Sequence, residues 1–259
     1  MNEILLCERA YLECFCEVTE KNGVLTCVDE LIKDMYSHNF FEVTASVDKE
    51  SVINKLNQKF KKIQETGHCA VVFTSDYEIQ KIDEISKNTL KKMKLTKNGC
   101  YILDKAQIDA WQERTDCEIY VFTSDKIKDV IQKDIEMDGE VIGEDFCRRR
   151  AERKGSVYEN NKNIDNYLLY HNNKLIATCE LFIENKVAKI EDFGVLEKYQ
   201  RIGYGTTLLK HVVCKALENG VETIFLDTDE EETAKEMYIK LGFSKIFEYY
   251  DLLWADWME

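Results

Sequence analysis

Residues 189–206 read KIEDFGVLEKYQRIGYGT, and this stretch decides how the second half of the chain folds. Its first seven residues are typical of a strand, and Gly203 and Gly205 then open a segment with apolar residues at helical spacing. A strand, a glycine-containing loop and a helix start together suit a bound pyrophosphate, because unsatisfied N–H groups at the helix N-terminus point at the anion. We therefore expect an anion-binding loop over residues 200–206, in which both glycines permit positive φ and a close backbone approach.

The segments around this loop alternate between strands and helices. The strands expected are 40–44, 69–74, 100–103, 118–122, 166–171, 174–183, 187–195, 223–228 and 245–254. The helices expected are 49–66, about 78–93, one that opens after 123–125, about 143–154, about 206–217 and 234–241. Turn-like Asn-Asn and Glu-Asn pairs join the three strands before the loop and predict an antiparallel meander. The whole predicts an α/β protein with a mixed sheet.

Two motifs in this order resemble those of the GCN5-related N-acetyltransferase (GNAT) superfamily. The acetyl-CoA signature of the family is Gln/Arg-x-x-Gly-x-Gly/Ala, which Gln200, Gly203 and Gly205 match. A later element is an Ala, a Tyr four residues on and then Gly-Phe, which Ala234, Tyr238 and residues 242–243 match.

The resemblance covers about 117–259 and implies the GNAT acyl-CoA N-acyltransferase fold for a domain over 115–259. It implies an enzyme that transfers an acetyl group from acetyl-CoA, its cosubstrate, to a primary amine of a small molecule or a protein, directly in a ternary complex. The residues that it implies for coenzyme binding are Phe193, Val195, Gln200, Arg201, Ile202, Gly203, Tyr204, Gly205, Thr206 and Ala234.

The same resemblance implies the roles at the reaction centre. The strand that ends at Phe193–Val195 would separate from its neighbour, and its free backbone would pair with the pantetheine arm. The Val195 N–H would polarise the thioester carbonyl, and Tyr238 would protonate the departing CoA thiolate. A core aromatic on a buried helix face is the alternative for Tyr238.

The base that takes the proton of the amine is less defined. Glu191 and Asp192 lie beside the expected reaction centre, and strand alternation sends their side chains to opposite faces, so at most one faces the substrate. We favour Glu191, against a structural or substrate-binding role. Acids at 227 and 229–232 suit either a cleft for a cationic amine or ordinary charge pairing at a helix N-terminus.

The N-terminal part, 1–114, is expected to be a smaller α/β domain. From Phe40 its order of elements is similar to the second half of an acetyltransferase domain, but residues 48–51 carry no glycine for a phosphate cradle. It is either a degenerate GNAT-like half or an unrelated module, which covers the sheet, shapes the acceptor site or forms a homodimer. The first forty residues are expected to be mostly helical. Two other functions stay open on this scaffold: a domain that binds CoA or a metabolite without transfer, and a protein-docking module.

The composition of the chain limits which partners, metal sites and cellular location we expect. The chain has 259 residues, with 49 acids against 35 bases and a net charge of −14, which disfavours nucleic acid and anionic membranes as partners. Ten cysteines are present without a Cys-x-x-Cys pair, so we expect reduced core thiols and no metal site. The N-terminus is not that of a secretory signal, which predicts a cytoplasmic protein.

Overall fold

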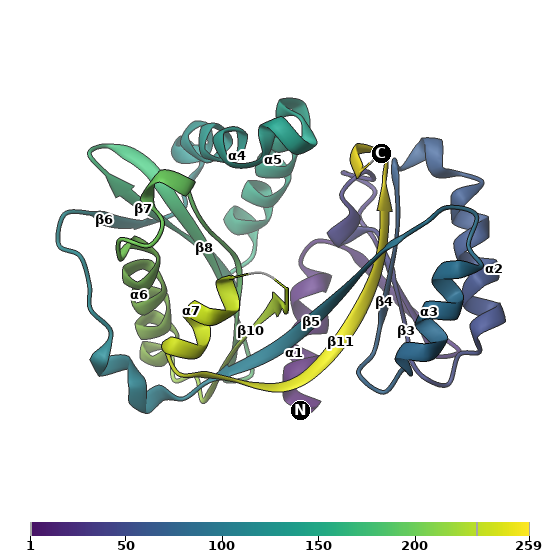
Figure 1. Ribbon diagram of the computed structural model, residues 1–259. Coiled ribbons are helices and arrows are strands. Elements are labelled where there is room, and N and C mark those ends of the chain that lie inside the picture. The colour runs from purple at the N-terminus through teal and green to yellow at the C-terminus, as the bar shows by residue number, and fades with distance from the viewer. Residues whose placement is uncertain (1, 232, 259) are drawn as a thin grey trace. The chain divides into compact units, whose positions relative to one another are not determined.

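The computed structural model describes residues 2–231 and 233–258, and the chain forms two compact units. Unit 1 comprises residues 1–14, 101–227 and 236–244, and unit 2 comprises residues 15–100, 228–235 and 245–259. The units interleave along the chain, since the long strands β5 (Lys94–Leu103) and β11 (Phe243–Ala255) each carry residues of both (Figure 1). The sequence places a domain boundary at 114/115. In the structure, Tyr101, Leu103, Ile108 and Trp111 are instead buried in the core of unit 1.

Unit 1 is built on a mixed sheet, which confirms the expected α/β class. In spatial order its strands are β6 (Glu118–Val121), β7 (Ile164–His171), β8 (Lys174–Glu184), β9 (Val187–Val195) and β10 (Thr223–Asp229). The first four are antiparallel neighbours, so the predicted meander is confirmed, and β10 runs parallel to β9. The turns hold Asn172, Asn173, Asn185 and Lys186 at positive φ, a conformation that Asn adopts more readily than most residues.

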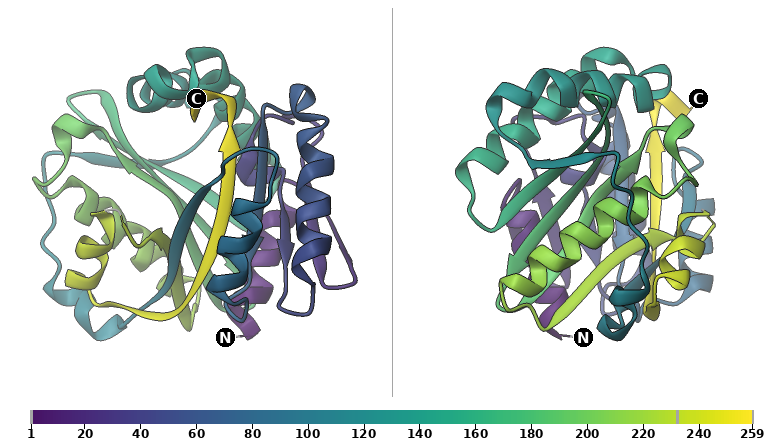
Figure 2. Two further views of the ribbon diagram at one scale, coloured as in Figure 1. Left: turned by 45° about the vertical axis from the view of Figure 1, so that its right-hand side comes forward. Right: turned by 90° about the vertical axis from the view of Figure 1, so that its left-hand side faces the viewer.

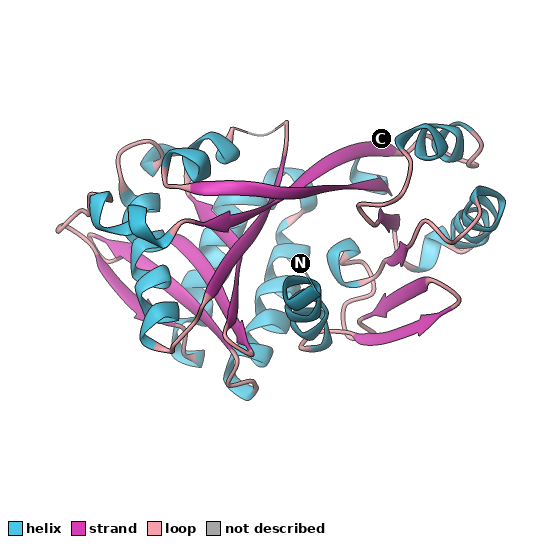
Figure 3. Ribbon diagram, turned by 90° about the horizontal axis from the view of Figure 1, so that it is seen from below, coloured by secondary structure: helices cyan, strands magenta, loops and turns pink. Residues whose placement is uncertain are grey.

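Helices cover both faces of this sheet (Figure 3). The α6 face carries α6 (Tyr204–Glu218) and α7 (Ala234–Lys240); the α5 face carries α1 (Asn2–Glu13), α4 (Ile127–Ile142) and α5 (Glu144–Asn160). Alternation along β7 separates the faces, because Leu169 joins the core with Leu208 and Val212, whereas Leu168 joins the core with Val130 and Ala151.

Unit 2 has a hydrophobic core of its own. Its elements are β1 (Glu17–Lys21), β2 (Val24–Val28), β3 (Phe41–Val43), α2 (Lys49–Phe60), β4 (His68–Phe73) and α3 (Ile79–Lys87). β3 and β4 are parallel, and β11 is antiparallel to β4. Phe41, Val71, Leu56 and Ile82 are fully or almost fully buried between the strands and the helices.

Short 3-10 helices complete the chain. They are η1 (Tyr36–His38), η2 (Ile63–Glu65), η3 (Lys105–Ala110), η4 (Ser124–Lys126), η5 (Glu197–Tyr199) and η6 (Asp256–Met258).

The expectation of a mostly helical start is wrong beyond residue 13. Residues 17–28 form the β1–β2 hairpin, in which Asn22 and Gly23 have φ of 52° and 74°. Two consecutive residues with positive φ are what a tight hairpin needs, and Asn-Gly is its strongest sequence signal. Most positions of β1 are polar and exposed. Hydrophobic periodicity therefore does not predict this hairpin.

The cysteines and the helices each show one further feature of the chain. All ten cysteines are free thiols and seven of them are buried, as expected of reduced core cysteines. Among the described residues, no helix is both long enough and apolar enough to cross a membrane.

Candidate functional site

The site begins where β9 and β10 separate. Their parallel pairing runs from Val187 with Thr223 to Ile190 with Leu226 and then stops, although β9 continues to Val195. Leu196 N donates to Ile176 O at 2.9 Å, so by the alternation of an antiparallel ladder the Val195 N–H points away from β8. The end of β9 therefore presents backbone groups to the gap beside β10, as expected.

The loop after β9 arranges a row of N–H donors. Arg201 and Gly203 have φ of 59° and 102°, and α6 starts directly after them. The first bond inside the helix is from Thr207 N to Gly203 O, at 3.0 Å. The N–H groups from Gly203 to Thr206 thus precede the helical pattern, and no side-chain cap is found there among the residues that the structure describes. Such a terminus favours an anion through its free donors and its dipole.

The two glycines act differently, which corrects the expectation that both allow positive φ. Only Gly203 adopts it. Gly205 is required for packing, because a Cβ there would lie 3.1 Å from Phe193 Cζ and 3.4 Å from Val195 Cγ2. Gly205 therefore lets the first turn of α6 lie against the end of β9.

Of the other residues predicted to bind the coenzyme, some contact the rest of the protein and others are exposed. Gln200 Nε2 donates to Val195 O at 2.8 Å and so ties the loop to β9. Tyr204 is buried, whereas Arg201 and Ile202 are exposed. Ala234 is the first residue of α7.

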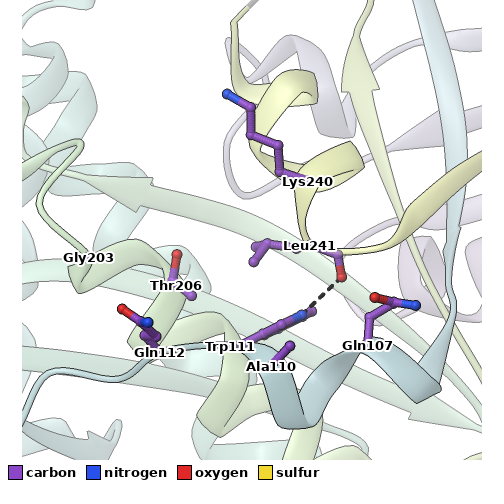
Figure 4. Close-up of a pocket in the computed structure, with 8 residues that line it drawn as sticks. All are labelled: Gln107, Ala110, Trp111, Gln112, Gly203, Thr206, Lys240 and Leu241. Carbon is purple, nitrogen blue, oxygen red and sulfur yellow. Dashed lines mark hydrogen bonds between the residues drawn. The ribbon is translucent and has the colours of Figure 1, made fainter.

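A cavity of about 350 Å³ lies between the N-terminus of α6 and the C-terminus of α7. It is lined by Gly203 and Thr206 together with Gln107, Ala110, Trp111, Gln112, Lys240 and Leu241. Figure 4 shows the indole of Trp111, whose N–H donates to Leu241 O at 3.0 Å. No sequence motif predicts this wall, because η3 and α7 are far apart in the chain. Lys240 is the basic residue among those that line the cavity.

Tyr238 lies on the α6 face, close to the end of β9. Its ring packs between Phe193 and Phe243, with centroid distances of 6.3 and 5.7 Å. Burial raises the pKa of its hydroxyl well above the usual range, and Cys179 and Glu191 add to the rise. The phenol is therefore protonated at neutral pH and has a proton to donate.

Glu191 and Asp192 do not alternate, which corrects the expectation that their side chains lie on opposite faces. Between Thr178 and Glu180 the register of β8 with β9 shifts, and Asp192 adopts a φ of 47°. This β-bulge places two residues of β9 against one of β8 and turns both carboxylates to the α5 face. There Glu191 pairs with Lys189 at 2.8 Å and Asp192 with Lys154 at 2.9 Å.

Both lysines are buried and belong to one polar network on that face. Lys189 Nζ lies 2.7 Å from Glu8 Oε1 and 4.6 Å from the ring centroid of Tyr11. Burial opposes the charge of Lys189, but Glu191, Glu8 and Asp227 outweigh it and raise its pKa. The lysine is therefore a cation whose contact with Glu8 joins β9 to α1. The purple helix α1 is drawn as a ribbon in Figure 2.

The second half of the network centres on Glu180, which is fully buried. Its Oε1 accepts from Lys154 Nζ at 2.6 Å and from the Tyr158 hydroxyl, and its Oε2 accepts from the Tyr11 hydroxyl at 2.7 Å. Burial raises the pKa of Glu180, whereas the lysine and the tyrosine hydroxyl lower it. The chain of contacts ends at Asp192, so the network holds both bulge carboxylates.

The acids proposed for a cationic acceptor are largely engaged locally. Asp227 lies 3.9 Å from Lys189, and Glu230 lies 3.3 Å from Lys245. Asp229 Oδ1 accepts from Glu231 N at 2.8 Å. Residue 232 lies outside the described residues.

Unit 2 has a strand-to-helix junction of its own, and an acid occupies it. Asp48 Oδ1 accepts from Ser51 N at 2.9 Å at the start of α2. A carboxylate at this helix terminus takes the place that an anion would need. The degenerate GNAT-like half stays a prediction.

A comparison with known proteins agrees with this geometry. Residues 135–243 match the model of the acetyltransferase (GNAT) family. The uncharacterized N-acetyltransferase CgeE of Bacillus subtilis is 33% identical over 110 residues, which are 40% of this chain and 42% of that protein. The [ribosomal protein bS18]-alanine N-acetyltransferase of Haemophilus influenzae is 31% identical over 83 residues, 31% of this chain and 56% of that protein. The chain thus spans about half the length of these relatives.

Solved structures resemble nearly the whole chain. A conserved protein of unknown function from Staphylococcus epidermidis has a TM-score of 0.76 at 18% identity, over 93% of this chain and 94% of its own. A GCN5-related N-acetyltransferase from Kribbella flavida has a TM-score of 0.64 at 13% identity, over 96% of this chain and 93% of its own. At these identities the similarity shows the fold alone.

Proposed function

We propose, on the premise that this chain belongs to the GNAT superfamily through residues 135–243, that it transfers an acetyl group from acetyl-CoA to a primary amine of a small molecule or a protein. One observation carries the proposal: the free end of β9 and the uncapped N-terminus of α6 lie next to each other in one compact unit. The first offers strand-like pairing to an amide-bearing arm, and the second offers N–H donors to a pyrophosphate.

The residues around the loop fit the phosphate-bearing end of acetyl-CoA. Gly203, Tyr204, Gly205 and Thr206 would donate backbone N–H groups to its pyrophosphate. Lys240 would add a positive charge in the adjoining cavity. The donor set has no acidic side chain at the helix start, in contrast with Asp48 in unit 2.

The roles proposed at the reaction centre are those that the family resemblance implies, for residues on the two faces of the sheet. The Val195 N–H would polarise the thioester carbonyl, and Tyr238 on the α6 face would protonate the leaving thiolate. Glu191 on the α5 face would accept the proton of the amine, so donor and acceptor would meet from opposite sides of the gap. Cys179, which lies opposite the bulge, is buried, and burial raises the pKa of its thiol. That environment disfavours a covalent thiolate intermediate and supports direct transfer.

The family match and the relatives carry the proposal of an amine acceptor, to which Glu191 as base and Tyr238 as acid would be suited. The proposal includes both an amine of a small molecule and an amine of a protein. We also propose that the reaction takes place in the cytoplasm and involves neither a nucleic acid nor a membrane. A homodimer is one role proposed for the N-terminal part.

The test is a calorimetric titration with acetyl-CoA of the wild type, of Thr206→Glu and of Thr206→Gln. Thr206 is the third residue of α6, where a glutamate stabilises the helix yet places a negative charge beside the phosphates. The glutamine has the same size without the charge. We expect Thr206→Glu to bind about tenfold to a hundredfold more weakly than Thr206→Gln. A folded wild type that does not bind acetyl-CoA would contradict the proposal. Binding without turnover on any amine would favour a CoA-binding or docking module.

A further inference from the structure

Arg114, which precedes β6, contacts the loop before α6 in several ways. Its Nη1 donates to Ile202 O at 2.9 Å, and its Cζ lies 4.4 Å from the ring centroid of Tyr204. Its backbone N donates to Thr207 Oγ1 at 2.8 Å. A single residue, which lies outside the segment that matches the family, thus contacts the loop and the first turn of the helix.

Asp116 fixes the orientation of this guanidinium. Arg114 Nε donates to Asp116 Oδ1 at 2.8 Å and Nη2 donates to Oδ2 at 2.6 Å, which is the bidentate geometry that sets a guanidinium plane. The Tyr204 hydroxyl also donates to Asp116 Oδ2, at 3.1 Å. The Arg114 guanidinium holds the pKa of Asp116 down to about 2, so the pair is ionised at neutral pH. Asp116 therefore joins Arg114 to the first residue of α6.

The contact with Ile202 O has a consequence for the donor row. The Ile202 carbonyl and the Gly203 N–H belong to one planar trans peptide, in which they point in opposite directions. A donor that holds the carbonyl therefore also sets the direction of the N–H. Arg201 and Gly203, on either side of Ile202, both have positive φ. Arginine does not prefer this conformation, so local backbone preferences do not hold this stretch in place.

We propose that Arg114 and Asp116 are positioning residues that lock the 202–203 peptide, so that the Gly203 N–H faces the pyrophosphate of the coenzyme. The inference rests on the proposed function, because it assigns a role in binding the same ligand. Arg114 acts here through the loop, and Asp116 acts through Arg114.

The sign of the Asp116 effect separates positioning from simple charge. Asp116→Asn removes a negative charge near the anion site, so electrostatics alone would strengthen the binding of acetyl-CoA. Positioning predicts the opposite, because Arg114 loses its bidentate partner. We expect Asp116→Asn and Arg114→Gln each to weaken binding by about tenfold or more, as for the loss of a hydrogen bond to a charged group.

The experiment is calorimetry with acetyl-CoA on both variants, with Arg149→Gln as a matched control and a melting curve for each protein. Arg149 pairs with Asp145 at 2.8 Å on the exposed side of α5, and its loss should leave binding unchanged. If Arg114→Gln does not fold, Asp116→Asn still decides. Unchanged or tighter binding by Asp116→Asn, while the wild type binds, would overturn the inference. Failure of the wild type itself to bind would overturn the proposed function instead.

Discussion

Replacing Lys154 with methionine tests the buried network behind the bulge. Lys154 Nζ lies 2.6 Å from Glu180 Oε1 and 2.9 Å from Asp192 Oδ2, and the Glu180 side chain is 0% exposed. Methionine fills a similar volume but leaves Glu180 with only the Tyr11 and Tyr158 hydroxyls. Breaking a buried ion pair on one side costs about 3–5 kcal/mol, so the free energy of unfolding should fall by that amount at pH 7.5.

The pH dependence of this loss is part of the prediction. Burial already raises the pKa of Glu180 above its unfolded value, and removal of Lys154 raises it further. A carboxyl with a raised pKa binds a proton more readily in the folded state, so its stability penalty shrinks as the pH falls through that pKa. The deficit of Lys154→Met should therefore be smaller at pH 5 than at pH 7.5.

Urea unfolding followed by circular dichroism at both pH values provides the measurement. Lys186→Met is the control, because Lys186 pairs with Glu222 at the surface, where both side chains are more than half exposed, and its loss should change little. Adding Glu180→Gln to Lys154→Met should restore part of the stability, since it removes the unpaired charge. A deficit below about 1 kcal/mol that does not vary with pH would refute the reasoning.

Three further predictions concern the helices around the site. Tyr238→Phe should lower the turnover of an amine acceptor by about 10²–10⁴-fold with the acetyl-CoA affinity unchanged; equal turnover would leave Tyr238 as a core aromatic. Tyr11→Phe should cost about 1–3 kcal/mol in chemical unfolding, because buried Glu180 loses a donor, and no loss would mean that α1 does not dock in this way. Gly203→Ala should weaken acetyl-CoA binding in calorimetry, because a φ of 102° strains an L-residue; wild-type affinity would show that the loop tolerates another conformation.

The sequence was sufficient where local chemistry and periodicity agree. The meander, the loop at 200–206 and the apolar face of α6 follow from turn residues, glycines and helical spacing, and all are found. The gap between β9 and β10 came from the family resemblance, and the pairing of the two strands confirms it.

Long-range contacts were beyond the sequence. The bulge at Asp192 depends on the register of β9 with β8, and no residue type within β9 predicts it. The place of α1 in unit 1 depends on Tyr11 and Glu8 meeting side chains about 170 to 180 positions away. Arg114 likewise reaches Ile202 across 88 positions. Such pairings are set by the tertiary fold, which a single sequence does not display.

The central claim is that the end of β9 and the start of α6 hold acetyl-CoA. Backbone amide NMR signals of the ¹⁵N-labelled protein, recorded before and after addition of acetyl-CoA, test it most directly. The account predicts that the largest changes occur at Val195 and at Gly203 to Thr206, while the amides at the start of α2, where Asp48 caps the helix, stay unchanged. Changes confined to other parts of the chain, or none at saturating acetyl-CoA, would contradict it.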